Sequence, residues 1–554
     1  MKAIPFHLPN NPNMACSKIF SGDLPEITEE IMQYLRKDFS TLYSCILVNR
    51  LWCRLAIPLL WEDPFSAPTR NYHCIKTYSC FFNEDSKAKF NEYEINDNLL
   101  ISNTLFNYPS FIKYLDIDKI CDSIKYWGGT LGDKFNFELG KLIYRSLFEV
   151  FIENEGNLNS FEAVLNLRVV HEYFVDNMDL ILQNSNLTYN ISNLYLEFIP
   201  KVIQDYIPFL TFLCSNCKSI SSIVFKFFKY KIDNHTLITL IEYLSKIIIS
   251  QQNLQKISFI YTIKPFLSLK NSNCSNTLNT IIFCYVDFNS IINNLQEVFN
   301  QLNVLESIHI IYCHSLNFNF VQQIIKVIKP FKLRSLFMDE ILHIESLLLL
   351  LQKFSDCLEN FGFGYTSEEY NEPKQKLFEF IIKYCKKIGY FESGMPDYDN
   401  IYLFIENNQY NSINYLTFDV DYSDNYTIYN KLSSTVLQNL GQVLPSKLEY
   451  LCLSLIFMKS DLEIFLKNSQ NTFIKKLLFR NIFIEDGNIL FCIKKYIMKK
   501  ERVRYLAILG VDDDVDELFS LKDEVNEFKL HNIIVQSYDD LYISEHDYIS
   551  NHLQ

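Results

Sequence analysis

The sequence predicts an α/β solenoid, in which each repeat contributes one strand and one helix, preceded by a small all-α module of three helices. Three observations predict this fold class. A short apolar pattern recurs many times between residues 191 and 508, and apolar residues at helical spacing lie between successive copies. A different pattern, typical of short packed helices, is concentrated between Gly22 and Phe65.

The composition is that of a folded protein with an acidic net charge. Of 554 residues, 48% are hydrophobic, 15% aromatic and 21% charged, which excludes a mostly disordered chain. The formal net charge of −14 argues against sequence-independent binding to nucleic acid, because such binding depends on lysine and arginine side chains that neutralise phosphates. Only 13 residues are glycine, so a glycine-rich phosphate-binding loop is also disfavoured.

The N-terminal module is predicted from capping residues and apolar spacing. Pro25 suits the first turn of a helix, where its missing N–H leaves no hydrogen bond unmade. Asp38 or Ser40 can cap a second helix that reaches Asn49, and a third helix carries Trp52. Helices in a segment of about 45 residues cannot bury all of their apolar side chains among themselves. The surplus predicts a partner protein.

The order of leucine, proline, acidic and tryptophan residues in this module resembles the F-box. The F-box pattern is a Leu-Pro pair, Glu-Ile, an apolar stripe, an aspartate, Val-x-x-x-Trp and a closing Leu-Trp. The sequence departs from it at Phe39, where a leucine commonly follows the aspartate. The matching residues are Leu24, Pro25, Glu26, Ile27, Ile31, Leu35, Asp38, Leu42, Cys45, Val48, Trp52, Leu59 and Trp61.

The resemblance implies docking onto the Skp adaptor of a Skp–cullin–F-box ubiquitin ligase and, through the adaptor, onto cullin. Such docking is a helix-in-groove association in which a few apolar anchors carry most of the affinity. Trp52 and Leu55 are equally suited to packing within the module. Transferred residue by residue, the adaptor-binding candidates are Leu24, Pro25, Ile27, Ile31, Leu35, Leu42, Val48, Trp52, Leu59 and Trp61.

The rest of the chain repeats an apolar-x-x-apolar-x-apolar unit. Its spacing ranges from 24 residues (Leu254 to Leu278) to 35 residues (Ile413 to Leu448), and most steps are typical of leucine-rich repeats. A degenerate copy is Cys385-Ile388-Tyr390. The regular copies are Ile191-Leu194-Leu196, Ile220-Ile223-Phe225, Leu254-Ile257-Phe259, Leu278-Ile281-Phe283, Leu305-Ile308-Ile310, Leu333-Leu336-Met338, Leu358-Phe361-Phe363, Ile413-Leu416-Phe418, Leu448-Leu451-Leu453, Ile474-Leu477-Phe479 and Val503-Leu506-Ile508.

Helical stretches are expected between these units. Apolar residues keep helical spacing from Ile291 to Leu302 and again from Val321 to Ile328. Because neither the strand nor the helix of a repeat can bury its apolar face alone, neighbouring repeats must stack into one continuous core. A Rossmann-like sheet would instead have fewer, longer strands and a glycine fingerprint, and the sequence has neither.

These patterns divide the chain into four parts. Residues 1–20 are predicted to be a flexible tail, 21–66 the F-box-like module, 67–185 a connection with irregular first repeats, and 186–554 the solenoid. An F-box followed by leucine-rich repeats resembles the F-box/leucine-rich-repeat substrate receptors of ubiquitin ligases, which fungi possess in large sets. The resemblance implies a non-catalytic subunit that holds a protein substrate near the charged ubiquitin carrier, so that proximity raises the rate. The alternative is a leucine-rich-repeat scaffold that binds a partner without ubiquitin transfer.

The predicted substrate surface is the concave face of the solenoid. Side chains alternate along a strand, so the residues beside the inward apolar positions point to this face. Aromatic residues there would act as anchors, and a small basic patch would suit an acidic or phosphorylated target. The alternative is that these are ordinary solvated strand residues. The candidates are His309, Phe337, Tyr415, Tyr450, Lys476, Arg480 and Tyr505.

No cofactor, metal or membrane segment is expected. Cys214 and Cys217 form a C-x-x-C pair, but no second pair lies at zinc-finger spacing, and the aspartates within 512–516 lack the glycine of a calcium loop. The apolar run from Leu347 to Leu351 is far too short to span a bilayer. Residues 1–13 lack the apolar core of a secretory signal, so the 15 cysteines are expected to be free thiols in the cytoplasm and/or nucleus.

Overall fold

The computed structural model divides the chain into two compact units, residues 1–254 (unit 1) and 255–554 (unit 2). The residues that it describes are 25–36, 38–66, 73–93, 95, 104–198, 202–227, 234–339, 343–364, 371–394, 400–408, 413–419, 426–481, 490–498, 501–510 and 517–552.

Unit 1 begins with the expected helical module, built from α2 (Pro25–Tyr34), α3 (Phe39–Ile46) and α4 (Arg50–Trp61). The core of the module is small, because each helix contributes only one or two residues to its buried cluster. Leu35, Trp52 and Leu55 pack against this core while remaining partly exposed. The core residues are Met32, Leu42, Cys45, Ala56 and Leu59.

Side-chain caps set the helix boundaries of the module. Asp38 caps α3, because its Oδ1 accepts a hydrogen bond from the backbone N–H of Thr41 at 3.0 Å. Asn49 does not extend the second helix as expected. Its side chain caps α4 instead, accepting from the backbone N–H of Trp52 at 2.9 Å. Asparagine favours this position because its short amide side chain competes for backbone hydrogen bonds and so disfavours a helix interior.

The remainder of unit 1 alternates helices with a parallel sheet. Strands β1 to β4 pair in sequence order, and Phe161, Leu194 and Ile223 are buried neighbours in register. Strand β2 therefore already belongs to the repeat array. The elements are α5 (His73–Tyr78), α6 (Glu84–Glu92), β1 (Tyr114–Asp116), α7 (Ile117–Gly129), α8 (Phe137–Glu153), β2 (Ser160–Leu165), α9 (Arg168–Asp176), α10 (Met178–Gln183), β3 (Asn193–Phe198), α11 (Ile203–Asn216), β4 (Ser222–Phe227) and α12 (Asn234–Ser250).

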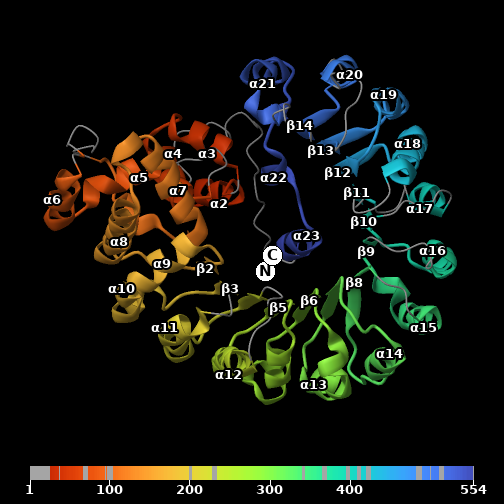
Figure 1. Cartoon of the computed structure of the whole chain (residues 1–554), viewed down its shortest axis with the longest axis horizontal. Coiled ribbons are helices and arrows are strands. Elements are labelled where there is room, and N and C mark those ends of the chain that lie inside the picture. The colour runs from red at the N-terminus through yellow and green to blue at the C-terminus, as the bar shows by residue number, and fades with distance from the viewer. Residues whose placement is uncertain are drawn as a thin grey trace, which may run out of the picture. The chain divides into compact units, whose positions relative to one another are not determined.

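Unit 2 continues the same pattern, with the helices that connect its strands on the outer side of the sheet (Figure 1). Strands β5 to β15 pair in parallel in sequence order. The elements up to the middle of the unit are β5 (Lys256–Ile260), β6 (Thr280–Cys284), α13 (Leu295–Gln301), β7 (Ser307–Ile311), α14 (Phe318–Ile325), β8 (Lys332–Met338), α15 (Ile344–Phe354), β9 (Asn360–Phe363), α16 (Asn371–Tyr384), β10 (Tyr390–Ser393) and α17 (Asn400–Asn408).

The last part of unit 2 ends with two short helices on the opposite side of the sheet from α13–α20 (Figure 1). The elements are β11 (Tyr415–Asp419), α18 (Tyr426–Val443), β12 (Lys447–Leu455), α19 (Lys459–Asn468), β13 (Phe473–Asn481), α20 (Leu490–Tyr496), β14 (Val503–Gly510), α21 (Lys522–Lys529), β15 (Ile534–Val535), α22 (Tyr538–Leu541) and α23 (Glu545–His552).

The prediction of an α/β solenoid is confirmed. Leu451, Leu477 and Leu506, the middle apolar residues of three successive predicted units, are neighbours in register across β12, β13 and β14 and are fully buried. Stacking of the same position in successive repeats is what makes the core continuous.

The degenerate copy at Cys385-Ile388-Tyr390 was placed three residues too early. In the sheet, Phe391 lies between Phe361 and Leu416, so the unit in register is Ile388-Phe391-Ser393. Burial alone does not separate the two alternatives, because all five residues of both versions are fully buried. The pairing of β10 with β9 and β11 decides between them.

Helix α14 is also shorter than expected. It ends at Ile325, and Ile328 is 86% exposed instead of continuing the apolar stripe. Beyond the helix, the backbone N–H of Ile328 donates a hydrogen bond to Asn300 Oδ1 at 3.0 Å instead of continuing the helical pattern.

Gln251 supports a stability prediction for unit 1. Its fully buried side chain accepts a hydrogen bond from the N–H of Ile220 at 3.0 Å and donates to the carbonyl of Cys217 at 2.8 Å. We expect Gln251→Ala to lower the free energy of unfolding by about 2–3 kcal/mol, because it leaves two buried backbone groups without partners. Urea unfolding would measure this, with the exposed neighbour as the control: Gln252→Ala should change the free energy by less than about 0.5 kcal/mol. Equal effects of both substitutions would contradict the prediction.

Candidate functional site

The three-helix module exposes two apolar stripes. On α2, Ile27, Ile31 and Tyr34 follow one another at spacings of four and three residues, so they lie on one helix face. Their exposed fractions are 45% at Ile27, 38% at Ile31 and 90% at Tyr34. The second stripe starts on α3 and continues into the turn that follows it; it consists of Tyr43, Leu47 and Val48.

The predicted adaptor-binding residues are distributed over this exposed surface and the core beneath it. Ile27, Ile31 and Val48 are exposed, Leu35, Trp52 and Trp61 are half-buried, and Leu42 and Leu59 are buried in the module core. Pro25 begins α2, whereas Leu24 and the side chain of Pro25 lie outside the described residues. Leu42 and Leu59 therefore hold the helices together.

The sequence reasoning did not select Tyr34, Tyr43 or Leu47, which are the most exposed members of the two stripes. A signal was present for Tyr34, since it continues the helical spacing of Ile27 and Ile31. Nothing in the spacing distinguishes which face of α3 would be left uncovered.

The module is fixed to the rest of unit 1 through α4 and the residue after it. The Trp61 ring packs against Tyr78 at 5.4 Å and Tyr108 at 4.3 Å between centroids. The backbone carbonyl of Glu62 accepts hydrogen bonds from the N–H groups of Lys113 and Tyr114, both at 2.9 Å. The helices that carry the two stripes are therefore anchored to the rest of unit 1.

The predicted substrate residues lie on the unit 2 sheet face opposite the helices, which we call the inner face. One row of residues near the beginning of the strands runs across the sheet in register. It contains five of the seven candidates and three further residues. That row is His309, Ser335, Asn360, Tyr390, Tyr415, Tyr450, Lys476 and Tyr505. The next row along the strands is Ile311, Phe337, Gly362, Glu392, Thr417, Cys452, Leu478 and Ala507. Arg480 lies beyond both rows and pairs with Ser454.

His309 is neutral in this setting. Burial lowers its pKa to about 3, and the positive charges of Arg334, Lys256 and His546 act in the same direction. Its Nδ1 lies 2.7 Å from the Ser335 hydroxyl oxygen, which also accepts a hydrogen bond from Asn360 Nδ2 at 2.8 Å. This chain of polar groups crosses β7, β8 and β9.

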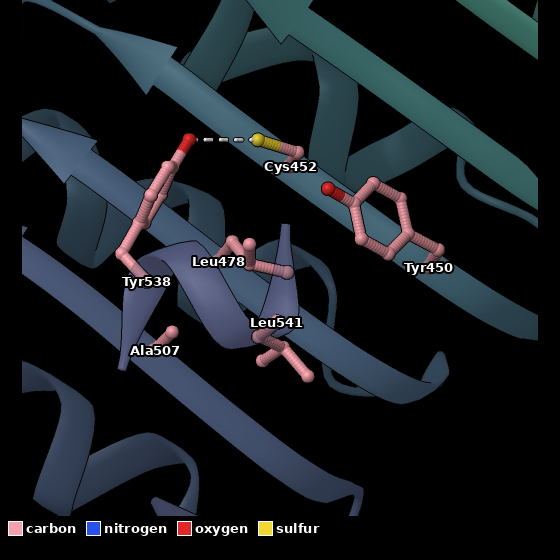
Figure 2. Packing of buried hydrophobic residues seen from close by; sticks show 6 residues of the cluster. All are labelled: Tyr450, Cys452, Leu478, Ala507, Tyr538 and Leu541. Carbon is pink, nitrogen blue, oxygen red and sulfur yellow. Dashed lines mark hydrogen bonds between the residues drawn. The ribbon is translucent and has the colours of Figure 1, made fainter. Parts of the chain in front are cut away.

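The inner face is covered by residues 537–552, which we call the C-terminal segment. Figure 2 shows Tyr538 and Leu541 of α22 packed over Leu478, Ala507 and Cys452. The Tyr538 hydroxyl lies 3.2 Å from the Cys452 sulfur, and Tyr450 accepts a hydrogen bond from the backbone N–H of Ile543 at 3.2 Å.

The second half of the C-terminal segment continues across the face toward β5. The ring of Tyr548 packs against Tyr390 at 4.7 Å and against Tyr415 at 4.5 Å between centroids. The Lys256 ammonium group donates a hydrogen bond to the carbonyl of Ser550 at 3.0 Å. The segment therefore lies across strands from β14 to β5.

This arrangement corrects the expectation of an open concave surface. Tyr450 and Phe337 are fully buried and His309 is 2% exposed, so a partner cannot reach them while the C-terminal segment is in place. Tyr415, Lys476, Arg480 and Tyr505 remain half-buried. The strand pattern correctly places these side chains on one face, but it contains no information about what covers that face.

The described residues provide no cluster of metal-ligating side chains. They contain no group of three or more histidine, cysteine or acidic residues placed to hold a metal ion. Cys214 and Cys217 point to different carbonyl groups, those of Tyr243 and Thr188. Burial raises the pKa of Cys217 to about 11 and that of Cys313 to about 12, so both thiols stay protonated and unreactive. Among the helices whose residues are described, none is both long and apolar enough to cross a bilayer.

Parallel strands that alternate with helices and stack in sequence order define the class of α/β solenoid proteins. No protein-family model matches the sequence, and no curated protein matches it. Among solved structures, the chain is similar to one chain of "Crystal structure of Rad7 and Elc1 complex in yeast", at 14% sequence identity and a TM-score of 0.32. The alignment covers 77% of this chain and 95% of that chain.

Proposed function

We propose that the chain is a non-catalytic receptor subunit of a ubiquitin ligase. Its three-helix module would dock on an adaptor of the Skp type, and through it on cullin, while the solenoid recruits a protein substrate. The observation that carries the proposal is the pair of exposed apolar stripes on α2 and α3, in the segment that resembles the F-box. Such a subunit would act in the cytoplasm and/or nucleus.

The energetics of the module support a partner at these stripes. Tyrosine, leucine and isoleucine side chains gain most from burial when they enter an apolar surface, and aromatic residues are enriched among binding hot spots. Tyr34, Tyr43 and Leu47 contribute nothing to the module core, since each is at least 66% exposed. Their apolar character is therefore available for association.

The test is co-purification of the full chain with a Skp adaptor and cullin. We expect Tyr43→Asp to lower adaptor retention at least about 30-fold, which corresponds to the roughly 2 kcal/mol of a hot-spot residue. Tyr34→Ala should weaken retention in the same way. Neither substitution should shift the melting temperature, because both side chains lie outside the core.

Tyr189→Asp is the matched control, since Tyr189 and Tyr43 are each 66% exposed and Tyr189 lies outside the module. This variant should bind the adaptor as wild type does. If folded wild-type protein is not retained, the receptor proposal fails and the alternative of a protein-binding scaffold without ubiquitin transfer is favoured. Equal loss in Tyr43→Asp and Tyr189→Asp would also overturn the assignment of the docking surface.

A further inference from the structure

We propose that the inner face of unit 2 is a peptide-binding surface, and that its C-terminal segment is a displaceable intramolecular ligand. The partner that fits this surface is a protein segment of the same chemistry: two tyrosines ten residues apart, with aliphatic residues between and after them. The inference concerns unit 2 and does not depend on the adaptor contact.

The C-terminal segment is held on the inner face by side-chain anchors. Strand pairing ends at Val535, before the segment begins. From there on, Tyr538, Leu541 and Ile549 are buried, whereas Asp539 and Asn551 are exposed. A few apolar anchors on one side and solvated polar residues on the other are the pattern of a bound peptide.

The C-terminal segment can leave the inner face without unfolding the sheet. Its helices α22 and α23 have four and eight residues, and helices of this length are not stable in water on their own. The repeat core beneath does not include it, since the inward residues such as Leu451 and Leu477 are buried between sheet and helices. Release of the segment is therefore a local transition from ordered to disordered chain.

The C-terminal segment leaves some buried polar groups at its contact with the inner face without hydrogen-bond partners. Within the described residues, His309 Nε2, His546 Nε2 and Ser550 Oγ are buried without a hydrogen-bond partner. The carboxyl groups of Glu392 and Glu545 are also placed side by side in a buried setting. A ligand that offers a neutral hydrogen-bonding group opposite Glu392 would avoid the cost of keeping this buried carboxyl pair protonated, and would displace the segment.

The test uses the full chain and a fluorescein-labelled peptide with the sequence of residues 537–552. In wild type, the covalently attached segment competes with the peptide at very high effective concentration. The peptide can bind only those molecules in which the face is open, so its apparent affinity is lowered in proportion to their fraction. The double variant Tyr538→Ala/Tyr548→Ala loses two anchors of the segment. We expect it to bind the peptide at least about tenfold more tightly than wild type does.

One further peptide and two further variants sharpen the result. A peptide carrying Glu545→Gln should bind the double variant more tightly than the parent peptide at pH 7.5, because a neutral amide can pair with Glu392 without the proton that the buried carboxyl pair has to retain. Adding Leu478→Lys to the double variant should abolish the gain, since Leu478 faces the segment and not the repeat core. The matched control is Asp539→Ala/Asn551→Ala, which alters only exposed positions of the segment and should bind like wild type.

Thermal unfolding confirms that each variant is folded before binding is interpreted. The proposal is overturned if the folded double variant does not bind the peptide, or if Leu478→Lys leaves binding unchanged. It is also overturned if wild type is a concentration-dependent dimer that the double variant does not form, because the segment would then cover the face of a second copy. Adaptor retention by the same variants is unaffected in either case, which keeps this test separate from that of the docking module.

Discussion

Phe391→Ala is expected to lower the free energy of unfolding of unit 2 by about 3–5 kcal/mol. Phe391 is fully buried in β10, and its ring packs against Phe404 at 4.7 Å and Phe378 at 6.0 Å between centroids. Truncation removes these aromatic contacts and leaves a cavity between the sheet and two helices. The effect follows directly from the register of β10, which places Phe391, and not Tyr390, between sheet and helices.

Urea unfolding followed by circular dichroism and by tyrosine fluorescence would measure the loss. Leu403→Ala is the control, because Leu403 precedes Phe404 on α17 and is 48% exposed. We expect it to change the free energy by less than about 1 kcal/mol. A small effect of Phe391→Ala would contradict the register and return the inward position to Tyr390.

Docking of the C-terminal segment is expected to weaken as the pH rises from 6.5 to 8, and Glu392→Gln is expected to remove this dependence. Burial raises the pKa of Glu392 well above its usual value, and the charge of Glu545 raises it further. Glu392 is 6% exposed and Glu545 7%, so solvent does little to relieve their repulsion. The other titratable groups around Glu392 are Tyr312, Asp419, Tyr390, Tyr542 and Cys452.

The sign follows from proton linkage. A carboxyl group whose pKa is raised on folding stabilises the folded state fully below its unfolded pKa, and this stability is lost as the pH rises through the folded pKa. His309, whose pKa is lowered to about 3, acts in the opposite direction, but only below its ordinary value of 6.5. Lys256, whose pKa burial lowers to about 8, acts in the opposite direction above that pH. The window from pH 6.5 to 8 therefore lies above the range of His309 and reaches only the start of the range of Lys256.

Hydrogen exchange of the α22 and α23 amides across this window, corrected for intrinsic exchange, would measure the opening of the segment. In wild type the free energy of opening should fall with pH by up to about 1.4 kcal/mol per pH unit. In Glu392→Gln it should be nearly constant and higher at pH 8 by about 1–3 kcal/mol, because no carboxyl group remains that has to be kept protonated for the segment to dock. Parallel profiles for the two proteins would show that Glu392 does not control docking.

Much of the fold could be predicted because the repeats carry a local and periodic signal. Units such as Leu448-Leu451-Leu453 lie on the strands they predicted, since a strand buried on one face requires alternating apolar residues. The signal failed at β10, where Cys385, Ile388 and Phe391 are all buried at a spacing of three. The spacing favoured the wrong register, because the unit in register ends at the polar Ser393 whereas the alternative unit ends at Tyr390.

The candidate sites were predictable to a smaller extent. Ile27 and Ile31 follow from helical spacing, and the alignment of Tyr415, Tyr450 and Tyr505 on one face follows from strand alternation. Tyr43 and Leu47 could not be selected, because their exposure depends on which face of α3 packs against α4. The choice between those faces is a property of the packed module.

By itself, the sequence determined that this chain is a solenoid of strand–helix repeats behind a small helical module with surplus apolar residues. Each of these conclusions rests on contacts between residues close in sequence or on a pattern that repeats. Only the tertiary structure decided that the C-terminal segment covers the inner face. The pair Cys452 and Tyr538 is 86 residues apart, and Lys256 and Ser550 are 294 apart. Contacts at such separations are selected by the energy of the assembled surface, and no local periodicity records them.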